Sequence, residues 1–483
     1  MPRPRPMRLP LNRSRTATAN AIALAVAWLA YLGVLQWSVV RFRVPIVLTL
    51  TACAVLLALW LATRARVAPT PWVAALVPVG SVALTLVVPL FSYLRGGPLT
   101  AAVGTLVVGS LAAGSALFMA GGGQRAPAAV RGWSRLALGV ACTAYAVTVA
   151  IAVLGDPAPR IDVWVTLQQA SDALARGENF YAMTWTGSPG IQDAFTYLPW
   201  AAVLLAPGRW LAGDVRWALG VWMLVAAAAF WRLAAPRRSP VPAAGAPRGK
   251  SAPAGATAVA SAARPHPAWI AAVAAVWLLL APGTLTQIDQ AWTEPLLLAG
   301  LGWWAVLVSR GRAWWAVLPL ALACASKQHL ALLLPLVMLW RPFGFRRAVA
   351  TGALTGILIA PWFLASPADF VHDTVTLLIG FHPIRFANTW YLLALNEYGV
   401  TLPFWLTGLV VLGTLGGSAW VVWRRQPPTA ELLRWLALVL LAANLVNKQA
   451  FYNQYWLSAA LVALSLAAPP SPRESPGRTA SVP

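Results

Sequence analysis

Long apolar runs separated by short polar segments make up most of the chain. The runs lie at about 21–40, 45–63, 72–94, 99–120, 134–154, 217–234, 268–282, 292–308, 313–326, 328–340, 348–365, 401–423, 432–447 and 454–468. Many are close to the roughly 20 residues that an α-helix needs to cross a bilayer, and all exceed the roughly ten-residue strands of a membrane barrel. Because only helices and closed barrels satisfy their backbone groups in hydrocarbon, the pattern predicts an all-α, polytopic transmembrane protein with about fourteen spans.

One interruption of this pattern, residues 156–195, is rich in acidic residues. It holds five of the chain's thirteen acids: Asp156, Asp162, Asp172, Glu178 and Asp193. A water-soluble, acid-bearing segment between membrane spans is a place where polar chemistry can occur at a bilayer surface. We therefore expect residues 156–195 to form the catalytic loop and to carry juxtamembrane helices.

The amino-acid composition agrees with a membrane protein and indicates which classes of partner to expect. Hydrophobic residues make up 59% of the chain and charged residues 10%, and many of the 27 tryptophans lie near the ends of apolar runs, as interfacial aromatic belts do. The net charge of +23 would suggest nucleic acid in a soluble protein. Here the arginines lie in short loops and tails, so we expect membrane lipids and no nucleic acid as partners.

Cysteine and histidine placement indicates no metal and no cofactor. Cys53, Cys142 and Cys324 all lie inside apolar runs, where they suit packing rather than a disulfide framework or a metal site. The four histidines have no metal-ligand spacing.

Charge bias predicts a topology and a domain organisation. We expect a basic cytoplasmic tail at 1–19, an additional N-terminal transmembrane module at 20–133, a core at 134–468 and a disordered tail at 469–483. Five crossings would place the acidic loop outside the cell membrane. The Pro- and Ala-rich linker 235–266, flanked by basic residues, is predicted to be cytoplasmic and disordered. Residues 197–212, broken by Pro199 and Pro207, are then expected to form a juxtamembrane or re-entrant element.

Three further polar clusters are predicted to lie on the same outer side as the acidic loop. They are residues 287–294, residues 326–329 and residues 447–456. Charged groups beside apolar spans are costly and often mark a functional site. Each cluster also has a structural alternative. Lys327 and Lys448 suit snorkelling, Asp289 and Glu294 suit helix starts, Asp172 and Glu178 suit a solvated helix face, and Asp156 suits a turn.

The order of these elements resembles a known family. A span leads into Asp162-Val163-Trp164, then a small-residue helix, then Gly177 to Tyr181, then Tyr197-Leu198-Pro199. A polar turn from Gln287 to Glu294 and a segment from Ala321 to Pro335 that contains Lys327 follow. Over about residues 140–468 this order resembles the GT-C membrane glycosyltransferases, particularly the polyprenyl-phosphate-mannose-dependent mannosyltransferase-like group.

The resemblance implies a function and roles for particular residues. It implies a hexosyltransferase that moves a sugar, expected to be mannose, from a polyprenyl-phosphate donor to an envelope glycan, glycolipid or protein acceptor outside the cell. One carboxylate must then take the proton of the acceptor hydroxyl, for which Asp162 is the first candidate and Asp156 the second. Cations near the donor phosphate would be Lys327, Arg385 and Lys448. The expected substrate-binding residues are Trp164, Tyr181, Tyr197, Gln287, Asp289, Gln290, Glu294, Gln328, His329, Gln454 and Tyr455.

Two other classes of protein remain open at the level of sequence. A transporter or lipid flippase would also be polytopic and basic, although it is expected to carry charges within spans and to have repeat symmetry. A non-catalytic membrane subunit would keep the topology without needing the carboxylate.

Overall fold

A computed structural model describes residues 11–65, 67–122, 125–235 and 265–469, and these residues contain helices and no strand. The N-terminal part consists of α1 (Leu11–Ser38), α2 (Val44–Thr63), α3 (Pro71–Val87), α4 (Gly96–Gly121) and α5 (Pro127–Gly155). The acidic loop and its surroundings form α6 (Asp162–Arg176), η1 (Phe180–Ala182), α7 (Trp200–Ala212) and α8 (Val215–Ala234).

The remaining chain contributes a second series of helices with several short elements. They are α9 (Pro267–Leu279), α10 (Thr284–Asp289), α11 (Glu294–Ser309), α12 (Val317–Cys324), η2 (Gln328–Leu333), α13 (Leu334–Leu339) and α14 (Phe345–Ala365). After these come α15 (Pro367–Val371), η3 (His372–Thr376), α16 (Leu377–Gly380), α17 (Trp390–Tyr398), α18 (Phe404–Arg425), α19 (Thr429–Val446) and α20 (Tyr452–Ala467).

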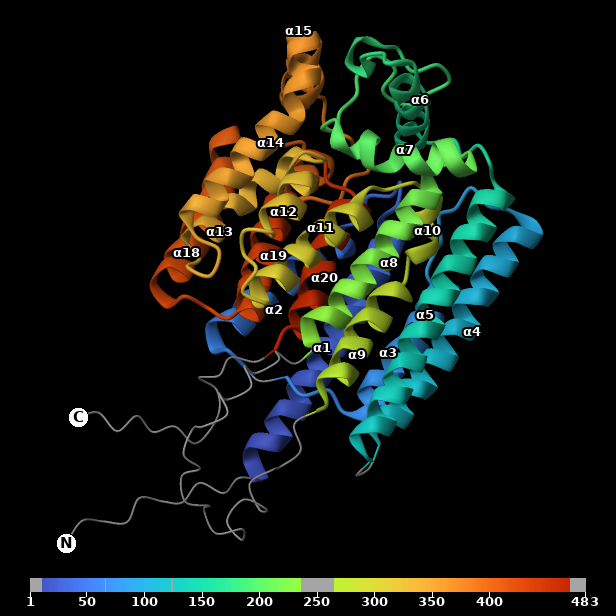
Figure 1. Cartoon of the computed structure of the whole chain (residues 1–483), viewed down its shortest axis with the longest axis vertical. Helices are drawn as coiled ribbons and strands as arrows, with labels where there is room; N and C mark the ends of the chain where they lie inside the picture. The colour runs from blue at the N-terminus through green and yellow to red at the C-terminus, as the bar shows by residue number, and fades with distance from the viewer. Residues whose placement is uncertain (1–10, 66, 123–124, 236–264, 470–483) are drawn as a thin grey trace, which may run out of the picture.

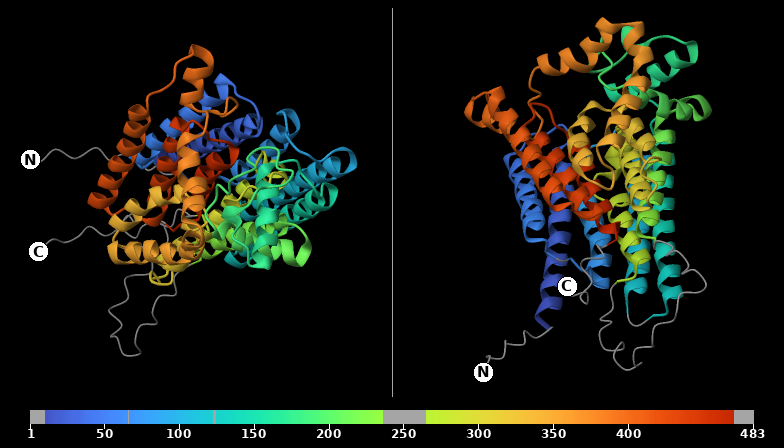
Figure 2. Two further views of the ribbon diagram at one scale, coloured as in Figure 1. Left: turned by 90° about the horizontal axis from the view of Figure 1, so that it is seen from above. Right: turned by 60° about the vertical axis from the view of Figure 1, so that its left-hand side comes forward.

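The long helices form a bundle with two distinct ends. Helices α6, α7 and α15 gather at one end, which we call the loop face, and α7 lies across the bundle there (Figure 1). The opposite end, where α1 begins and α8 ends, we call the tail face. Figure 2 shows the same separation from a second direction. The acidic segment thus forms a helical cap over one end of the bundle.

Several helices have the dimensions of membrane spans. Eight are long and apolar enough to cross a bilayer: α1 from Thr16, α2, α4, α5, α8, α14, α18 and α19. The shorter apolar helices include α3, α9, α11 and the η2–α13 segment. The predicted all-helical, polytopic character is therefore confirmed at this level, whereas the count of about fourteen crossings stays a prediction.

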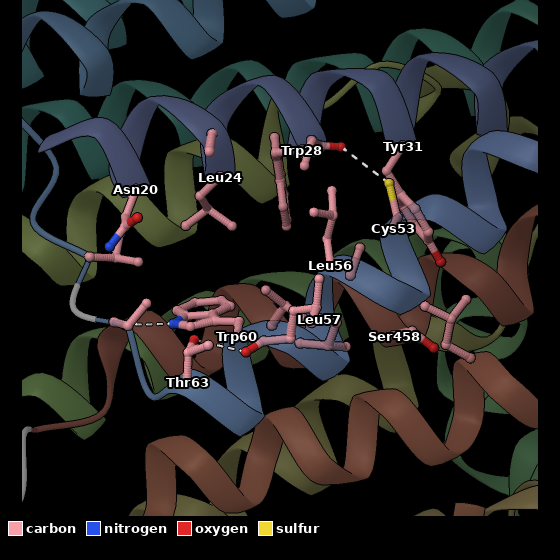
Figure 3. Close-up of a pocket in the computed structure, with 18 residues that line it drawn as sticks. Asn20, Leu24, Trp28, Tyr31, Cys53, Leu56, Leu57, Trp60, Thr63 and Ser458 are labelled. Atoms are coloured by element: carbon pink, nitrogen blue, oxygen red, sulfur yellow. Dashed lines mark hydrogen bonds between the residues drawn. The ribbon is translucent and has the colours of Figure 1, made fainter. Parts of the chain in front are cut away.

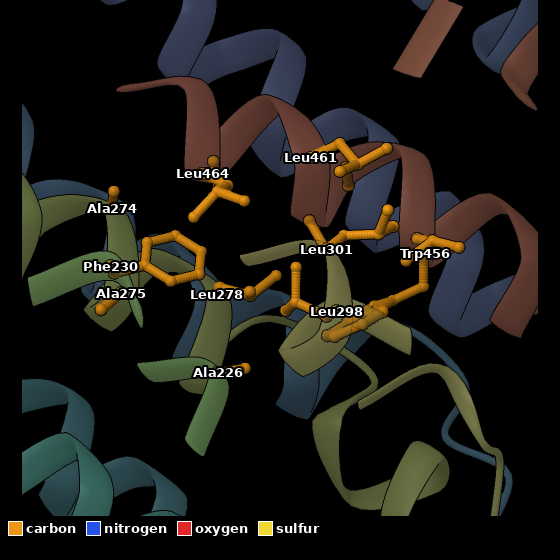
Figure 4. Packing of buried hydrophobic residues seen from close by; sticks show 14 of the residues in the cluster. Ala226, Phe230, Ala274, Ala275, Leu278, Leu298, Leu301, Trp456, Leu461 and Leu464 are labelled. Atoms are coloured by element: carbon orange, nitrogen blue, oxygen red, sulfur yellow. The ribbon is translucent and has the colours of Figure 1, made fainter. Parts of the chain in front are cut away.

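The centre of the bundle is a long buried segment. Every residue from 271 to 299 is buried, covering the end of α9, all of α10 and the start of α11. Figure 4 shows Phe230 of α8, Leu278 of α9, Leu301 of α11 and Leu464 of α20 packing together. A helix that is apolar all round is expected at such a central position, and α10 carries its polar residues into this buried region.

Small residues let neighbouring helices approach closely. A Cβ atom on Gly109 of α4 would lie 2.4 Å from the Cβ of Ala144 on α5. Any larger side chain at Gly109 would force the two helices apart, because close approach of this kind depends on small residues.

The structure differs from the predicted elements in two places. The run 72–94 was expected to be one span, but its helix α3 ends at Val87, and a second difference lies in the core. The run 313–326 was expected to be one span, but its helix is α12 alone, from Val317 to Cys324, and the following run starts as the 3-10 helix η2. Pro335 at the start of α13 removes a backbone donor at this point. The linker 235–266, the tail 469–483 and the first ten residues of the basic tail lie almost wholly outside the described residues.

Candidate active site

A buried ion pair joins three helical regions near the loop face. Lys327, between α12 and η2, places its Nζ atom 2.5 Å from Oε1 of Glu294 at the start of α11. The side-chain amide of Asn453 on α20 donates to the same carboxylate oxygen at 3.0 Å. Glu294 is fully buried, and Lys327 and Asn453 are 8% and 7% exposed. A buried charge pair needs such additional hydrogen bonds, because desolvation opposes its formation.

The second oxygen of this carboxylate has no partner within the described residues. Oε2 of Glu294 is buried without a hydrogen bond, and so is Oδ1 of Asp289. Both amide atoms of Gln287, which lies between α9 and α11 on the same buried segment, are also unpartnered. Buried polar atoms are normally satisfied. Unused hydrogen-bonding capacity therefore concentrates along residues 287–294.

An aromatic ring connects the ion pair to the acidic loop. The Lys327 Nζ atom lies 5.3 Å from the centre of the Tyr197 ring. Burial raises the pKa of the Tyr197 phenol well above its usual value, and the nearby carboxylates of Glu294 and Asp162 raise it further. Tyr197 thus lies within electrostatic reach of Lys327, Glu294 and Asp162 together.

Two hydrogen bonds hold the Tyr197 segment in this position. The side-chain amide of Gln328 donates to the Thr196 carbonyl at 3.0 Å, and the Trp200 backbone N–H donates to the Ala325 carbonyl at 3.1 Å. The segment before α7 is therefore fixed against the turn that carries Lys327. This placement requires contacts between residues more than a hundred positions apart in the sequence.

Asp162 is the first residue of α6 and is only partly accessible. Its Oδ1 atom accepts a hydrogen bond from the Val163 backbone N–H at 2.8 Å, and a carboxylate at a helix N-terminus interacts favourably with the helix dipole. Burial nevertheless raises the pKa of Asp162 above its usual value, and the Val163 amide offsets only part of that effect. A carboxylate of this kind is a better proton acceptor than an exposed aspartate.

Gly190 leaves space for the Asp162 carboxylate. A Cβ atom at position 190 would lie 2.8 Å from Oδ2 of Asp162. The end of the acidic loop therefore folds back on the start of α6, and the absence of a side chain at Gly190 permits this close approach.

A third carboxylate is held by the loop between α3 and α4. Oδ2 of Asp289, at the end of α10, accepts from the Tyr93 backbone N–H at 2.6 Å. The Tyr93 hydroxyl in turn donates to the Arg160 carbonyl at 2.5 Å. Burial raises the pKa of Asp289, while hydrogen bonds from Tyr93 and Ser92 oppose the shift. Tyr93 therefore connects α10 to the segment that leads into Asp162.

A buried arginine on α8 holds the start of the acidic loop in place through hydrogen bonds. Arg216 on α8 pairs with Asp214 at 2.8 Å, and the two side chains are 0% and 5% exposed. Arg216 also donates to the Asp156 carbonyl at 2.6 Å, and the Trp164 indole donates to Asp214 at 3.0 Å. Asp156 and Trp164 thus take part in joining α5, α6 and α8.

The remaining predicted residues divide into packing residues and peripheral ones. The hydroxyl of Tyr181 donates to the Tyr197 carbonyl at 2.8 Å, and that of Tyr455 donates to the Asn388 carbonyl at 2.7 Å. Gln454 accepts from the Phe451 N–H within its own helix start. Gln290 lies beside Asp289, with its amide 3.4 Å from Oδ2, and His329 is half-buried next to Gln328.

Arg385 and Lys448 occupy more accessible positions than Lys327. Arg385 is exposed, and the Lys448 ammonium donates to the Ile379 carbonyl at 2.5 Å. Of the three predicted phosphate-binding cations, Lys327 is the one that shares hydrogen bonds or ring contacts with the buried carboxylate cluster in the described part of the chain. The candidate active site therefore consists of Lys327, Glu294, Tyr197, Asp162 and Asp289.

Sequence reasoning missed several residues that build this site. Asn453 belongs to the polar cluster 447–456, but the residues predicted there to bind substrate were its neighbours Gln454 and Tyr455. Tyr93 and Gly190 carry no motif, because they act through contacts with distant residues. Asp373 on η3, whose carboxylate accepts from the Phe195 N–H at 2.7 Å, was also not selected.

Metal ligands and related proteins give no further guide to the chemistry. Within the described residues, there is no group of three or more His, Cys, Asp or Glu side chains that could hold a metal ion. Comparison of the chain with protein-family models and with curated proteins finds no match. The fold and the site together have the architecture of a polytopic helical membrane protein with buried charges at one end of its bundle.

Proposed function

We propose that this protein is an integral membrane glycosyltransferase with a GT-C-like fold. It would transfer a sugar, with mannose as the expected one, from a polyprenyl-phosphate donor to an envelope glycan, glycolipid or protein acceptor. The observation that carries the proposal is the buried ammonium group of Lys327, which is paired with Glu294 and lies 5.3 Å from the centre of the Tyr197 ring. The Asp162 carboxylate acts electrostatically on the phenol of the same Tyr197. Sugar transfer from a phosphate needs a base for the acceptor and a cation for the leaving phosphate.

The reaction assigns a separate task to each group. The acceptor hydroxyl oxygen attacks the anomeric carbon and forms the new glycosidic bond, while the bond between that carbon and the phosphate oxygen breaks. The lipid phosphate leaves with the electron pair, and the acceptor proton moves to the Asp162 carboxylate. Burial, which raises the pKa of Asp162, makes this carboxylate a stronger base.

Lys327 stabilises the leaving phosphate in this scheme. An ammonium group has three N–H donors, and Lys327 uses one of them on Glu294. The pair with Glu294 fixes the ammonium group near the Tyr197 ring, so that another donor can bind a phosphate oxygen as negative charge develops. Asn453 and Glu294 are positioning residues for Lys327.

The charge bias of the chain supports a site at the outer surface of the membrane. The arginine-rich segments favour a cytoplasmic tail face, which leaves the loop face and its carboxylates outside. A lipid-linked donor can reach such a site from within the bilayer, and a water-borne acceptor can reach it from the other side. Membrane lipids, the lipid donor and an envelope acceptor are therefore the proposed partners.

The test is sugar transfer by the purified protein in lipid vesicles. The donor is a polyprenyl-phosphate sugar labelled in the sugar, and the acceptor is an envelope glycolipid extract. We expect label to move to the acceptor with wild-type protein and not with protein inactivated by heat. Equal label in the two samples would refute the enzymatic proposal.

A second function is favoured by one observation. A buried Lys–Glu pair next to an unpartnered carboxylate oxygen is also typical of proton relays in transporters. A lipid flippase would move a fluorescent lipid-linked sugar across the vesicle membrane without releasing its sugar. Measuring transfer and lipid movement in the same vesicles separates the two functions.

A further inference from the structure

Three turns of the core helices, which we call the basic turns, are rich in arginine. They are residues 309–316 between α11 and α12, 340–347 between α13 and α14, and 423–429 between α18 and α19. The side chain of Arg310 in the first turn donates to the Arg232 carbonyl near the end of α8 at 2.9 Å, which places this turn at the tail face. Together the basic turns contain seven arginines and neither aspartate nor glutamate: Arg310, Arg312, Arg341, Arg346, Arg347, Arg424 and Arg425.

Contacts between the basic turns join them into one surface. The Arg347 guanidinium group of the second turn lies 5.3 Å from the centre of the Trp314 ring in the first. The indole N–H of Trp340 in the second turn donates to the Pro427 carbonyl of the third at 2.7 Å. A bias of positive charge toward the cytoplasmic side sets the orientation of a membrane protein. That bias does not require the charges to meet, as they do here.

Gln426 fixes two of the arginines beside each other. It follows Arg425 directly, and its side-chain oxygen accepts a hydrogen bond from the Arg341 backbone N–H at 2.7 Å. Its side-chain amide donates to the Leu339 carbonyl at 3.0 Å. The φ angle of Gln426 is +46°, a left-handed conformation that is uncommon outside glycine. The fold thus holds Arg341 and Arg425 close together, although their charges repel.

Four arginines of the basic turns are available to a ligand. Within the described residues, they have no side-chain hydrogen bond, ion pair or ring contact, and all are exposed: Arg312, Arg341, Arg346 and Arg425. The acid closest to them in sequence is Glu431, two residues past the third turn. That carboxylate pairs with Arg64 instead. A ligand with negative charge would therefore relieve the repulsion between these arginines.

The neighbouring corner of the tail face, between α1, α2, α19 and α20, is different because its arginines already have partners. Arg64 lies 3.7 Å from Glu431, and Arg434 donates to the Ser465 hydroxyl at 3.1 Å. Figure 3 shows the apolar space of this corner, with Trp60 in it. Uncompensated charge is thus a property of the basic turns and not of this corner.

Exposed aromatic residues among the arginines indicate a membrane as the partner. Trp314 and Trp315 are 58% and 73% exposed, and Phe345, at the start of the candidate span α14, is 63% exposed. Tryptophan is enriched at the headgroup level of bilayers, where its ring meets hydrocarbon and nearby cations meet phosphate. A guanidinium group can bind two phosphate oxygens in its own plane. Arginine and tryptophan together therefore suit a phospholipid headgroup better than a water-borne acidic protein.

We infer that the basic turns bind the headgroup phosphate of an anionic glycerophospholipid, with Arg341 and Arg425 as its principal ligands. The lipid neutralises two arginines that Gln426 holds together. The inference does not depend on the proposed enzymatic function, since the basic turns contain none of the residues of the candidate active site.

The test uses the full-length protein and native mass spectrometry. The protein is exchanged into an equimolar mixture of palmitoyl-oleoyl phosphatidylglycerol and palmitoyl-oleoyl phosphatidylcholine, and the retained lipids are counted. We expect the wild type to retain phosphatidylglycerol preferentially. The double variant Arg341→Gln/Arg425→Gln should lower this preference by about fivefold for each arginine, the usual effect of one basic residue at an anionic surface.

Two controls separate a built site from net charge. Arg131→Gln/Arg135→Gln removes two exposed arginines of α5 and should leave the preference for phosphatidylglycerol within about twofold of the wild type, because these residues lie outside the basic turns. Gln426→Gly keeps every charge and suits the left-handed backbone, but it removes the bonds to Arg341 and Leu339. It should lower the preference as the arginine pair does.

Three outcomes would overturn the inference. One is equal retention of the two lipids by the wild type. Another is an equal loss of preference in the two arginine pairs, which would make the effect one of net charge alone. The third is binding of soluble polyglutamate that depends on Arg341 and Arg425 while lipid retention does not, which would assign the basic turns to an acidic protein.

Discussion

Lys327 and Glu294 form a buried ion pair, 2.5 Å apart and 33 positions apart in the sequence, on two segments that meet near the loop face. The pair explains why a lysine lies in an otherwise apolar region. It also changes what a substitution at Lys327 means. Removing the ammonium group alone leaves a fully buried carboxylate without its counter-charge, so loss of activity and loss of folded protein must be separated.

For the ion pair, we predict that Lys327→Met alone is strongly destabilising. Breaking a buried pair by removing one partner costs about 3–5 kcal/mol, whereas removing both charges is often nearly neutral. The double variant Lys327→Met/Glu294→Gln should therefore recover the thermal stability of the wild type. Thermal unfolding in detergent, followed by tryptophan fluorescence, measures both changes.

The same double variant tests the role of Lys327 in transfer. It should remain folded but fail to use the polyprenyl-phosphate donor, because no cation is then left at the phosphate. Lys448→Met is the matched control, since Lys448 is bonded to the Ile379 carbonyl outside the buried cluster. Normal transfer by the folded double variant would remove Lys327 from the mechanism.

For the candidate base, we predict that Asp162→Asn lowers turnover by about 10²–10⁴-fold, the usual contribution of general-base catalysis. The substitution is nearly isosteric, and its amide oxygen can still accept from the Val163 N–H, so folded protein should accumulate normally. Transfer of labelled sugar at matched protein concentration gives the measurement. Asp156→Asn, at the C-cap of α5, should have a much smaller effect; the reverse order would identify Asp156 as the base.

The pH dependence of kcat/KM should reflect the ionisation of the Asp162 carboxylate. A base must be deprotonated to act, so kcat/KM should fall as the pH falls through the pKa of Asp162. Because burial raises this pKa above 3.8, the fall should begin at a higher pH than an ordinary aspartate would give. A kcat/KM that stays constant down to the pH at which an ordinary aspartate is protonated would contradict the assignment of Asp162 as the base.

For the carboxylate of α10, we predict that Asp289→Asn raises the melting temperature at neutral pH. Burial raises the pKa of Asp289 above 3.8, so the folded state favours the protonated form. The stability that this group contributes is fully present below pH 3.8 and is lost as the pH rises through the raised pKa. Asparagine keeps an acceptor for the Tyr93 N–H without the charge.

Melting temperatures of wild type and Asp289→Asn across a pH series check this prediction. The difference in melting temperature between the variant and the wild type should be largest at neutral pH. It should shrink as the pH falls toward the usual pKa of an aspartate. A melting temperature for the variant below that of the wild type at neutral pH would show that the ionised carboxylate is stabilising.

For the loop contact, we predict that Gly190→Ala reduces turnover by about tenfold to a hundredfold, since displacement of a reacting group by about 1 Å has effects of that size. The new Cβ atom would meet Oδ2 of Asp162 at 2.8 Å and push the carboxylate aside. Gly97→Ala is the control, because the space around Gly97 is open. Equal turnover of the two variants would show that Asp162 tolerates the shift.

For the topology, we predict that cysteines on the loop face and the tail face label from opposite sides of the membrane. Thr184 on the acidic loop and Ala235 at the end of α8 are both exposed and suit labelling. In a background without Cys53, Cys142 and Cys324, an impermeant thiol reagent added outside intact cells should label Thr184→Cys only. External labelling of Ala235→Cys would reverse or break the proposed topology.

The sequence by itself determined the class of fold, because helix formation in apolar surroundings depends on local properties. Run length and composition are sufficient to predict membrane helices, and the runs at 45–63 and 99–120 correspond closely to α2 and α4. The acid-rich loop and the polar turn at 287–294 were also identified locally, since charges beside apolar runs are rare enough to be noticed. Helix ends near Pro335 were less well predicted, because a proline leaves more than one local geometry open.

Only the tertiary structure decided which polar residues meet. The sequence offered Lys327 as the first cation and Arg385 and Lys448 as second choices. Of these three, packing of α11, α12 and α20 brings Lys327 to Glu294 and Asn453. Gln454 and Asn453 are adjacent in sequence, yet a rotation of about 100° per residue along α20 directs them to different surroundings. Desolvation, which raises the pKa values of Asp162 and Asp289, depends on atoms from distant segments, so no local pattern contains it.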